Sequence, residues 1–247
     1  SSTTIYKPLT DWTINKCRST DSQIIGFYND GKVTNLELLV TYANGSTTTF
    51  YITPSAPSGH MVTYFKVTPL TYGGTTDNIQ LFVNWANGGA RRYAIGTIYV
   101  QSCGKYDPIR LAYLNEYGTY DFFNFDLVSK TSFDIEKKGY QKDYSGDIYN
   151  ADNVIVKNTN PIYYTKETQK YKLNSDYLTD AQSVLIRQLY NAPLVYMNLV
   201  NDTQITPSWI PVKPVANSYE LKQSISDKLF NLEIDVEFGL VNTRQSV

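Results

Sequence analysis

The chain has 247 residues and a formal net charge of −1, so no global positive field would steer it to nucleic acid or anionic lipid. Its apolar stretches are all shorter than the roughly 18 residues that a membrane-spanning helix needs. Residues 1–4 also lack the basic and apolar regions of a signal peptide, so we expect neither a membrane span nor a secretion signal.

Tyrosine is unusually abundant, with 22 residues, while charged residues make up only 18% of the chain. The charged share is about 25% in typical globular domains. Tyrosine gives a large, stiff, amphipathic surface that suits both β-strands and protein interfaces. The composition therefore favours a β-rich protein and leaves open whether the tyrosines serve strands or contacts with partners.

Hairpin signals dominate the first hundred residues. Asn44-Gly45 separates two β-rich runs, and this dipeptide is the strongest short-range hairpin signal because a type I′ turn needs positive φ at both central residues. Asn87-Gly88-Gly89 separates two further runs in the same way. The predicted strands are residues 36–42, 47–52, 62–67, 79–85 and 92–100. Residues 1–103 are thus predicted to form a β-sandwich of immunoglobulin or fibronectin type III size.

A second, mostly antiparallel β domain is predicted for residues 104–247. A hairpin is expected over residues 110–125, and a polar segment at residues 139–160 is expected to be a long loop or extended arm. A helix is predicted at residues 180–190, with Thr179 as N-cap and Pro193 beyond its end. Further strands are predicted at residues 194–199, 209–212 and 232–238.

The last of these strands has the clearest pattern in the chain. Its four apolar residues alternate with Glu233, Asp235 and Glu237, which is typical of a half-buried strand. Because three like charges on one strand face repel one another, we expect either a cationic neighbour or open solvent there.

Catalytic constellations are scarce. His60 is the single histidine, so a Ser/His/Asp or Cys/His triad would depend on it, and its sequence context suggests an ordinary loop residue. Cys17 and Cys103 lie in no recognisable nucleophile motif and are expected to be buried free thiols. Nucleotide-binding glycine motifs are also missing from the sequence. We predict that the chain is not an enzyme and has no catalytic, cofactor-binding or metal site.

A pair of carboxylates could form an active site without histidine, since a glycosidase needs only two acidic residues. Asp121 with Asp126 is interpreted as a pair of turn residues, and Glu233 with Glu237 as part of a solvated strand face. The segment from Asp143 to Asp147 comes nearest to a calcium loop but has too few acids.

Two segments carry a family resemblance. Residues 103–125 read CGKYDPIRLAYLNEYGTYDFFNF, and residues 227–238 read DKLFNLEIDVEF. They resemble an R-L-x-x-L-N-x-x-G-x-x-D-x-F-x-F hairpin and a terminal D-K-L-F-N-L/Y-x-I-E-F-E motif in virion proteins of Bacteroidetes-infecting phages, crAss-like phages among them. Between these segments, residues 173–179 precede a short helix and a P-x-V-Y strand at residues 193–196, in the family's order. Thr119 departs from the family, which often has a second glycine or an aromatic residue there.

This resemblance implies a tail-associated structural protein of the virion, assembled in the host bacterial cytoplasm. Such proteins form rings, hubs or adaptors, so the implied partners are copies of the same chain and other tail or connector proteins. In a ring subunit, the charged terminal strand could pair across a subunit border. The alternative is a carbohydrate- or receptor-binding β module in which Trp12, Trp85 or Trp209 stacks on sugar rings.

Overall fold

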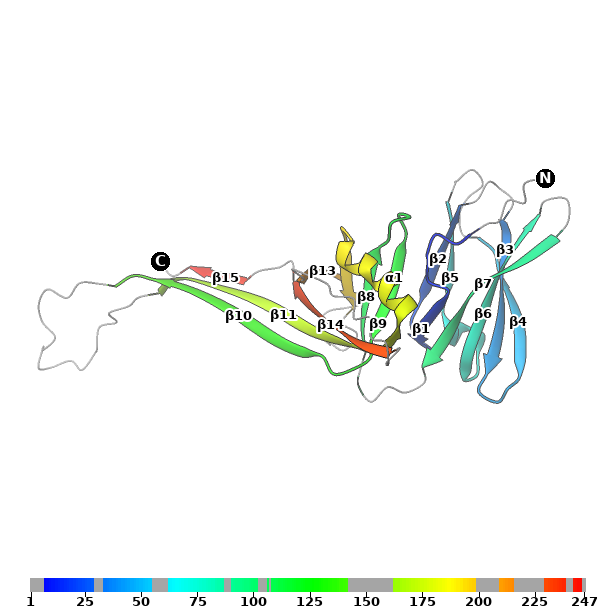
Figure 1. Ribbon diagram of the computed structural model, residues 1–247, viewed down its shortest axis with the longest axis horizontal. Helices are drawn as coiled ribbons and strands as arrows, with labels where there is room; N and C mark the ends of the chain where they lie inside the picture. The colour runs from blue at the N-terminus through cyan, green and yellow to red at the C-terminus, as the bar shows by residue number, and fades with distance from the viewer. Residues whose placement is uncertain are drawn as a thin grey trace, which may run out of the picture.

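A computed structural model of the chain shows a mainly β protein with one α-helix, as the sequence predicts. The described strands form three sheets. Figure 1 shows an elongated molecule with a sandwich at one end and a narrow ribbon of strands extending toward the other. The structure describes residues 7–28, 33–54, 62–86, 90–101, 106, 108–141, 162–198, 209–215, 229–238 and 242–245.

The sandwich consists of a five-stranded sheet in the order β1-β7-β6-β3-β4, facing the two-stranded sheet β2-β5. All its pairings are antiparallel except that of β1 with β7, which is parallel. A short 3-10 helix, η1 (Pro69–Tyr72), follows β5. The strands are β1 (Ile14–Arg18), β2 (Gln23–Tyr28), β3 (Val33–Tyr42), β4 (Thr47–Ile52), β5 (Val62–Val67), β6 (Thr76–Ala86) and β7 (Ala90–Gln101).

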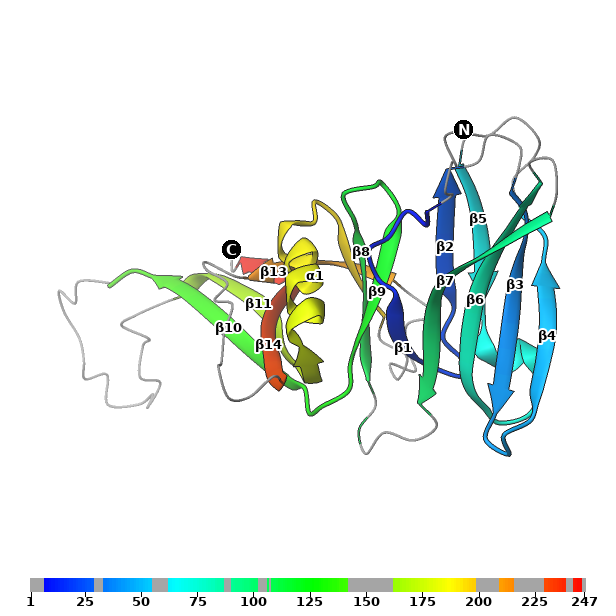
Figure 2. The same cartoon turned by 45° about the vertical axis from the view of Figure 1, so that its right-hand side comes forward.

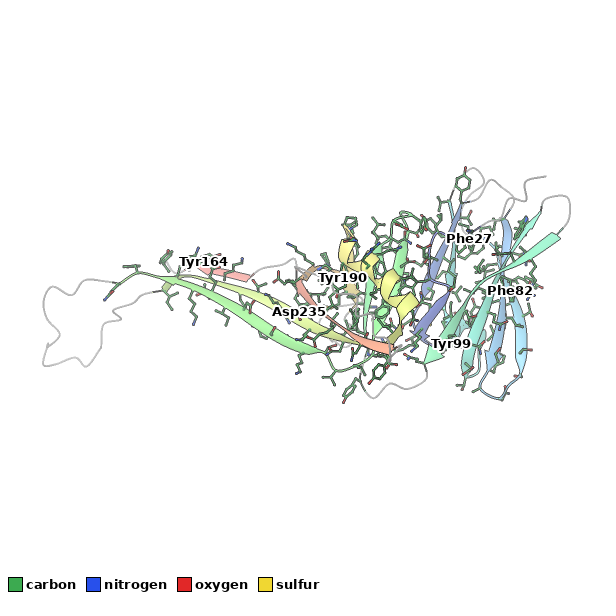
Figure 3. The ribbon with its side chains drawn as sticks, viewed as in Figure 1. Phe27, Phe82, Tyr99, Tyr164, Tyr190 and Asp235 are labelled. Carbon is green, nitrogen blue, oxygen red and sulfur yellow. The ribbon has the colours of Figure 1, made fainter. Side chains whose placement is uncertain are left out.

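A single apolar core holds the two sheets of the sandwich together. Strand β3 alternates so that Leu36, Leu38 and Val40 are fully buried, which is the period-2 pattern of a strand with one face on a core. Phe27 of β2 meets Phe65 of β5 edge-on, with ring centroids 5.7 Å apart. Figure 3 places Phe27 beside the core between the sheets.

The predicted strands of this half are all present. The predicted hairpin at Asn44-Gly45 forms, but its turn is not the predicted two-residue type I′ turn. The Gly45 amide donates to the Tyr42 carbonyl over 2.8 Å, and Tyr42 pairs with Ser46, so the loop consists of residues 43–45, with Gly45 at a φ of 81°. The Ser46 amide donates to Asn44 Oδ1 over 2.9 Å. The Asn87-Gly88-Gly89 turn lies outside the described residues, as does His60. Strands β1 and β2 were not predicted.

The second half forms an eight-stranded sheet in the order β10-β11-β14-β13-β12-β8-β9, with β15 also paired to β11. Helix α1 (Asp180–Asn191) buries Ile186 and Leu189 in the core of this half. Figure 2 shows the helix, in yellow, against the sheet. The strands are β8 (Ile109–Leu114), β9 (Tyr120–Phe125), β10 (Lys130–Gly139), β11 (Ile162–Thr179), β12 (Val195–Asn198), β13 (Trp209–Val215), β14 (Leu229–Phe238) and β15 (Asn242–Gln245).

Strand β14 lies inside the sheet, between β11 and β13. Leu232, Ile234 and Val236 face the core, which confirms the predicted alternation. Both edges of β14 are hydrogen-bonded within the chain over residues 235–237, so this part of the strand cannot pair across a subunit border. For the rest of β14, such pairing stays a prediction.

The ribbon is the ladder that residues 133–139 of β10 form with residues 162–169 of β11, beyond the part of β11 that pairs with β14 (Figure 1). Strand β10 runs to Gly139, the first residue of the segment predicted as a loop or arm at 139–160, and residues 142–161 lie outside the described part of the chain. Neither β10 nor β11 was predicted.

Candidate functional site

The hairpin of β8 and β9 carries most of the residues on which the phage resemblance rests. Its turn is organised by Asn115, whose Oδ1 accepts hydrogen bonds from the amides of Tyr117 and Thr119, each over 3.0 Å. Gly118 has a φ of 79°, and the Asn115 amide donates to the Thr119 carbonyl over 2.8 Å. The asparagine and the glycine of the motif are therefore turn-forming residues.

The same turn is tied to the N-terminal segment that precedes β1. Asn115 Nδ2 donates to the Leu9 carbonyl over 2.8 Å, and the Thr119 hydroxyl donates to the same carbonyl over 2.6 Å. Asn115 Nδ2 also lies 3.0 Å from Asp121 Oδ2. Burial raises the pKa of Asp121 to about 6, and the hydrogen bond from Asn115 partly offsets this rise.

Arg110 forms the second link between the two halves, 89 positions along the chain from its partner Asp21. Its side chain on β8 is almost fully buried, and Nη1 donates to Asp21 Oδ2 over 3.1 Å and to Asn124 Oδ1 over 3.0 Å. Nη2 donates to the Ser22 carbonyl over 2.8 Å, and the guanidinium lies 4.7 Å from the centre of the Phe122 ring. Burial lowers the pKa of Arg110, while the neighbouring Asp21 raises it.

Asp21 lies in the turn between β1 and β2, and sequence reasoning missed it. Its Oδ2 also accepts hydrogen bonds from the Arg18 amide, over 2.9 Å, and from Asn124 Nδ2, over 3.0 Å. A buried carboxylate with this many donors is well satisfied. We name the buried contacts made by Leu9, Trp12, Asp21, Arg110, Asn115 and Thr119 the joint.

Trp12 completes the joint. Its Nε1 donates to the Tyr113 hydroxyl over 2.7 Å, and its ring lies 5.8 Å from that of Phe123. Burial raises the pKa of Tyr113 strongly. Trp12 thus comes before the first strand of the sandwich but packs into the core of the second half.

Two of the three tryptophans predicted to stack on sugars are buried, so that role is wrong for them. Trp12 and Trp85 are 8% and 5% exposed. Trp209, on β13, is 40% exposed and lies 5.9 Å from the Phe122 ring. Only Trp209 of the three could stack on a ligand.

One member of the pair Asp121 with Asp126 has surroundings different from those expected, whereas Glu233 and Glu237 lie on the outer face of β14 as interpreted. Asp121 is a buried residue within strand β9, so its interpretation as a turn residue is wrong. Asp126 follows β9, and burial raises its pKa to about 6. The acids at Asp143 and Asp147 lie outside the described residues.

The predicted cationic neighbour of the acidic face on β14 is present. Lys170 of β11 lies 2.9 Å from Glu237 and 2.6 Å from Asp134 of β10, and Lys172 pairs with Glu233. Figure 3 shows Asp235 on the same strand. The hydrogen bonds to Asp134 and Glu237 raise the pKa of Lys170. These pairs bind β14, β11 and β10 together on the face opposite the core.

Cys17 is buried and free, as predicted, and burial raises its pKa to about 12. Cys103 lies outside the described residues. Over the part of the chain that the structure describes, no cluster of three or more His, Cys, Asp or Glu residues could hold a metal ion. In the same residues, no helix is both long and apolar enough to cross a membrane. A pocket beside the joint, lined in part by Trp12 and Asp121, has a volume of about 40 Å³, which suits a few water molecules.

Neither the known family models nor the curated proteins contain a match to this chain. Its candidate functional surface must therefore be identified from its own geometry.

The most exposed strand is β10. Each of its ten residues is exposed, and Phe133 and Ile135 are 54% and 55% exposed. Strand β10 forms one end of the eight-stranded sheet and pairs only with β11 among the described strands. A long edge strand with exposed apolar side chains is a template for pairing with another chain. The ribbon is therefore the candidate interaction surface.

Proposed function

We propose that the chain is a non-enzymatic structural subunit of a phage virion, a tail hub, ring or adaptor protein that self-associates and docks other tail proteins. The two resembling segments support this proposal, as they follow the family's order across the second half of the chain. The hydrogen bonds of Arg110 and Asn115 give the first segment a physical role in joining the two halves.

The observation that carries the proposal is the exposed ribbon. Natural proteins blunt long edge strands with charged side chains, proline, bulges or covering segments because such strands aggregate. Strand β10 carries lysines and acids but no proline, and Phe133 and Ile135 are exposed between these charges. Retaining such a strand is reasonable if assembly covers it.

Exposed tyrosines add to this support. Tyr51, Tyr64 and Tyr99 of the sandwich are each more than 40% exposed. Figure 3 marks Tyr99 on β7 and Tyr164 far along the ribbon. Since tyrosine is enriched at protein interfaces, the unusual tyrosine content has an external use as well as a structural one.

The test has two measurements. The native mass of the purified full chain, measured across micromolar concentrations, should show species larger than one subunit. Peptide mass spectrometry of purified particles from the phage or prophage that encodes the chain should recover it with the tail proteins. A strict monomer that is also absent from the particles would overturn the proposal.

A carbohydrate-binding module is the second candidate, and the exposed Trp209 beside Phe122 favours it. An aromatic pair of this kind suits stacking on a sugar ring. Glycan-array binding that disappears in Trp209→Ala and persists in Trp85→Phe would support it. Absence of binding by the unaltered chain would remove it.

A further inference from the structure

Strand β10 has one edge that no described strand pairs with, and its side chains form two chemically distinct faces. Thr131, Phe133, Ile135 and, toward the end of the strand, Lys137 lie on one face, because Thr131 is paired with Tyr171, which in turn is paired with the buried Val236. The apolar face of β10 is therefore an uncovered continuation of the core face of the sheet. The opposite face carries Lys130, Ser132, Asp134, Glu136 and Lys138.

Resting on the proposed self-association, we infer that β10 pairs antiparallel with β10 of a second copy, with Phe133 opposite Phe133. In this register Lys130 of each copy lies opposite Glu136 of the other, so each interface holds two complementary charge pairs. Ile135 lies opposite Thr131, and the two apolar faces join on one side of the extended sheet. The two eight-stranded sheets become continuous through the new ladder.

Charge complementarity selects this register. Residues that lie opposite each other in an antiparallel ladder share a face, so a two-fold axis must pass through a residue position. An axis at Asp134 places Asp134 opposite itself. An axis at Ile135 places Asp134 opposite Glu136, and an axis at Glu136 places Glu136 opposite itself. Like charges directly opposite each other are destabilising. An axis at Ser132 also avoids such clashes and places Lys130 opposite Asp134, but it joins only residues 130–134 of each β10 and leaves Glu136 without a cationic partner. The axis at Phe133 joins residues 130–136 without a clash and is the longer ladder.

The sharpest test uses two charge reversals. Lys130→Glu and Glu136→Lys each place like charges opposite each other in both pairs of a homodimer, so each variant alone should self-associate at least about tenfold more weakly. An equimolar mixture restores opposite charges at both pairs and should recover the association of the unaltered chain. Sedimentation velocity at several concentrations measures all three samples.

Matched controls separate the register from a general effect of charge. Lys66→Glu and Glu116→Lys make the same charge changes at exposed positions away from β10, and both should associate like the unaltered chain. Thermal melts of the four variants report whether each is folded, and recovery in the mixture itself requires folded partners.

Cysteine cross-linking checks the same geometry independently. Phe133→Cys should form an intermolecular disulfide on mild oxidation, because directly opposed residues lie within bonding range. Ile135→Cys should not, since the two copies of position 135 would be offset by about 13 Å along the strands.

Each outcome decides a different point. Recovery only in the mixture, with cross-linking only at position 133, supports the β10 pairing. A self-associating chain that ignores both β10 reversals and resists cross-linking at 133 overturns the pairing and leaves the proposed self-association standing on another surface. A chain that stays monomeric overturns both.

Discussion

Replacing Arg110 by methionine should show how firmly the joint holds the two halves together. The change keeps an unbranched side chain but removes the buried positive charge that lies 3.1 Å from Asp21; the Arg18 side chain, 3.7 Å from the other carboxylate oxygen, remains. Breaking a buried ion pair by removing one partner costs about 3–5 kcal/mol. Because Asp21 keeps its hydrogen bonds from the Arg18 amide and from Asn124, we expect a loss at the lower end, about 3 kcal/mol.

A loss of about 3 kcal/mol corresponds to a fall in melting temperature of roughly 6–12 °C for a chain of this size. Urea unfolding followed by tryptophan fluorescence measures the free energy, and Trp12, inside the joint, reports the local environment. Adding Asp21→Asn to Arg110→Met should recover part of the loss. The second substitution removes the buried negative charge of Asp21, which has lost its partner Arg110.

Lys16→Met is the matched control for this experiment. Lys16 of β1 forms an ion pair with Asp176 of β11, which also links the two halves, at 3.6 Å, but both side chains are more than 40% exposed. Exposed pairs contribute about 0–1 kcal/mol, so the control should lose no more than that. If Arg110→Met costs as little as Lys16→Met, the buried-pair reasoning is refuted.

The remaining predictions concern close packing, a buried hydrogen bond and pH. In Gly26→Ala, the new Cβ would lie 2.9 Å from Thr119 Cγ2, so we expect the free energy of unfolding, measured by thermal melting, to fall by about 1–3 kcal/mol. Adding Thr119→Ser removes that methyl group and keeps the hydroxyl, so it should restore most of the lost stability. Tyr113→Phe removes the acceptor of the Trp12 indole N–H and should cost about 1–3 kcal/mol in urea unfolding, with no effect if that N–H finds another partner. Burial raises the pKa of Asp126 from 3.8 to about 6, so the folded chain binds this proton more tightly than the unfolded chain. The free energy of unfolding should therefore fall as the pH rises from 3.8 to 6, and Asp126→Asn should make that decline shallower; an unchanged slope would contradict the assigned pKa.

Local signals predicted the parts of the fold that local chemistry determines. The hairpin at Asn44-Gly45 and the alternation of residues 232–238 each depend on neighbouring residues alone, and both form, although the turn of the hairpin spans residues 43–45 and is not of type I′. Strands β1 and β11 contain many polar residues, so hydrophobic periodicity does not mark them as strands, and the period-2 signal of β10 is weak. Their conformation depends on partners elsewhere in the chain, since β1 pairs with β7 and β10 with β11.

The joint could be predicted only in part. Arg110 and Asn115 stood out through the family resemblance, but their partners Asp21 and Leu9 lie about a hundred positions away. No local pattern indicates which acid a buried arginine will meet, because the choice depends on how two folded halves pack. In β10, Phe133 and Ile135 alternate with polar residues, and this weak period-2 signal could have identified the ribbon.

The distribution of stabilising contacts explains why the ribbon, rather than the joint, is suited to binding a partner. Both halves bury apolar cores, and the joint adds buried hydrogen bonds between them. Among the described residues, strand β10 is held by its ladder with β11 and by contacts near the surface, such as the ion pair of Lys170 with Asp134, and surface ion pairs add little net stability. Segments with few buried apolar contacts open at low free-energy cost. Pairing with a second β10 would supply the hydrogen bonds and the apolar cover that β10 lacks, so amide hydrogen exchange in β10 should slow as the protein concentration rises, while exchange in β3 stays unchanged.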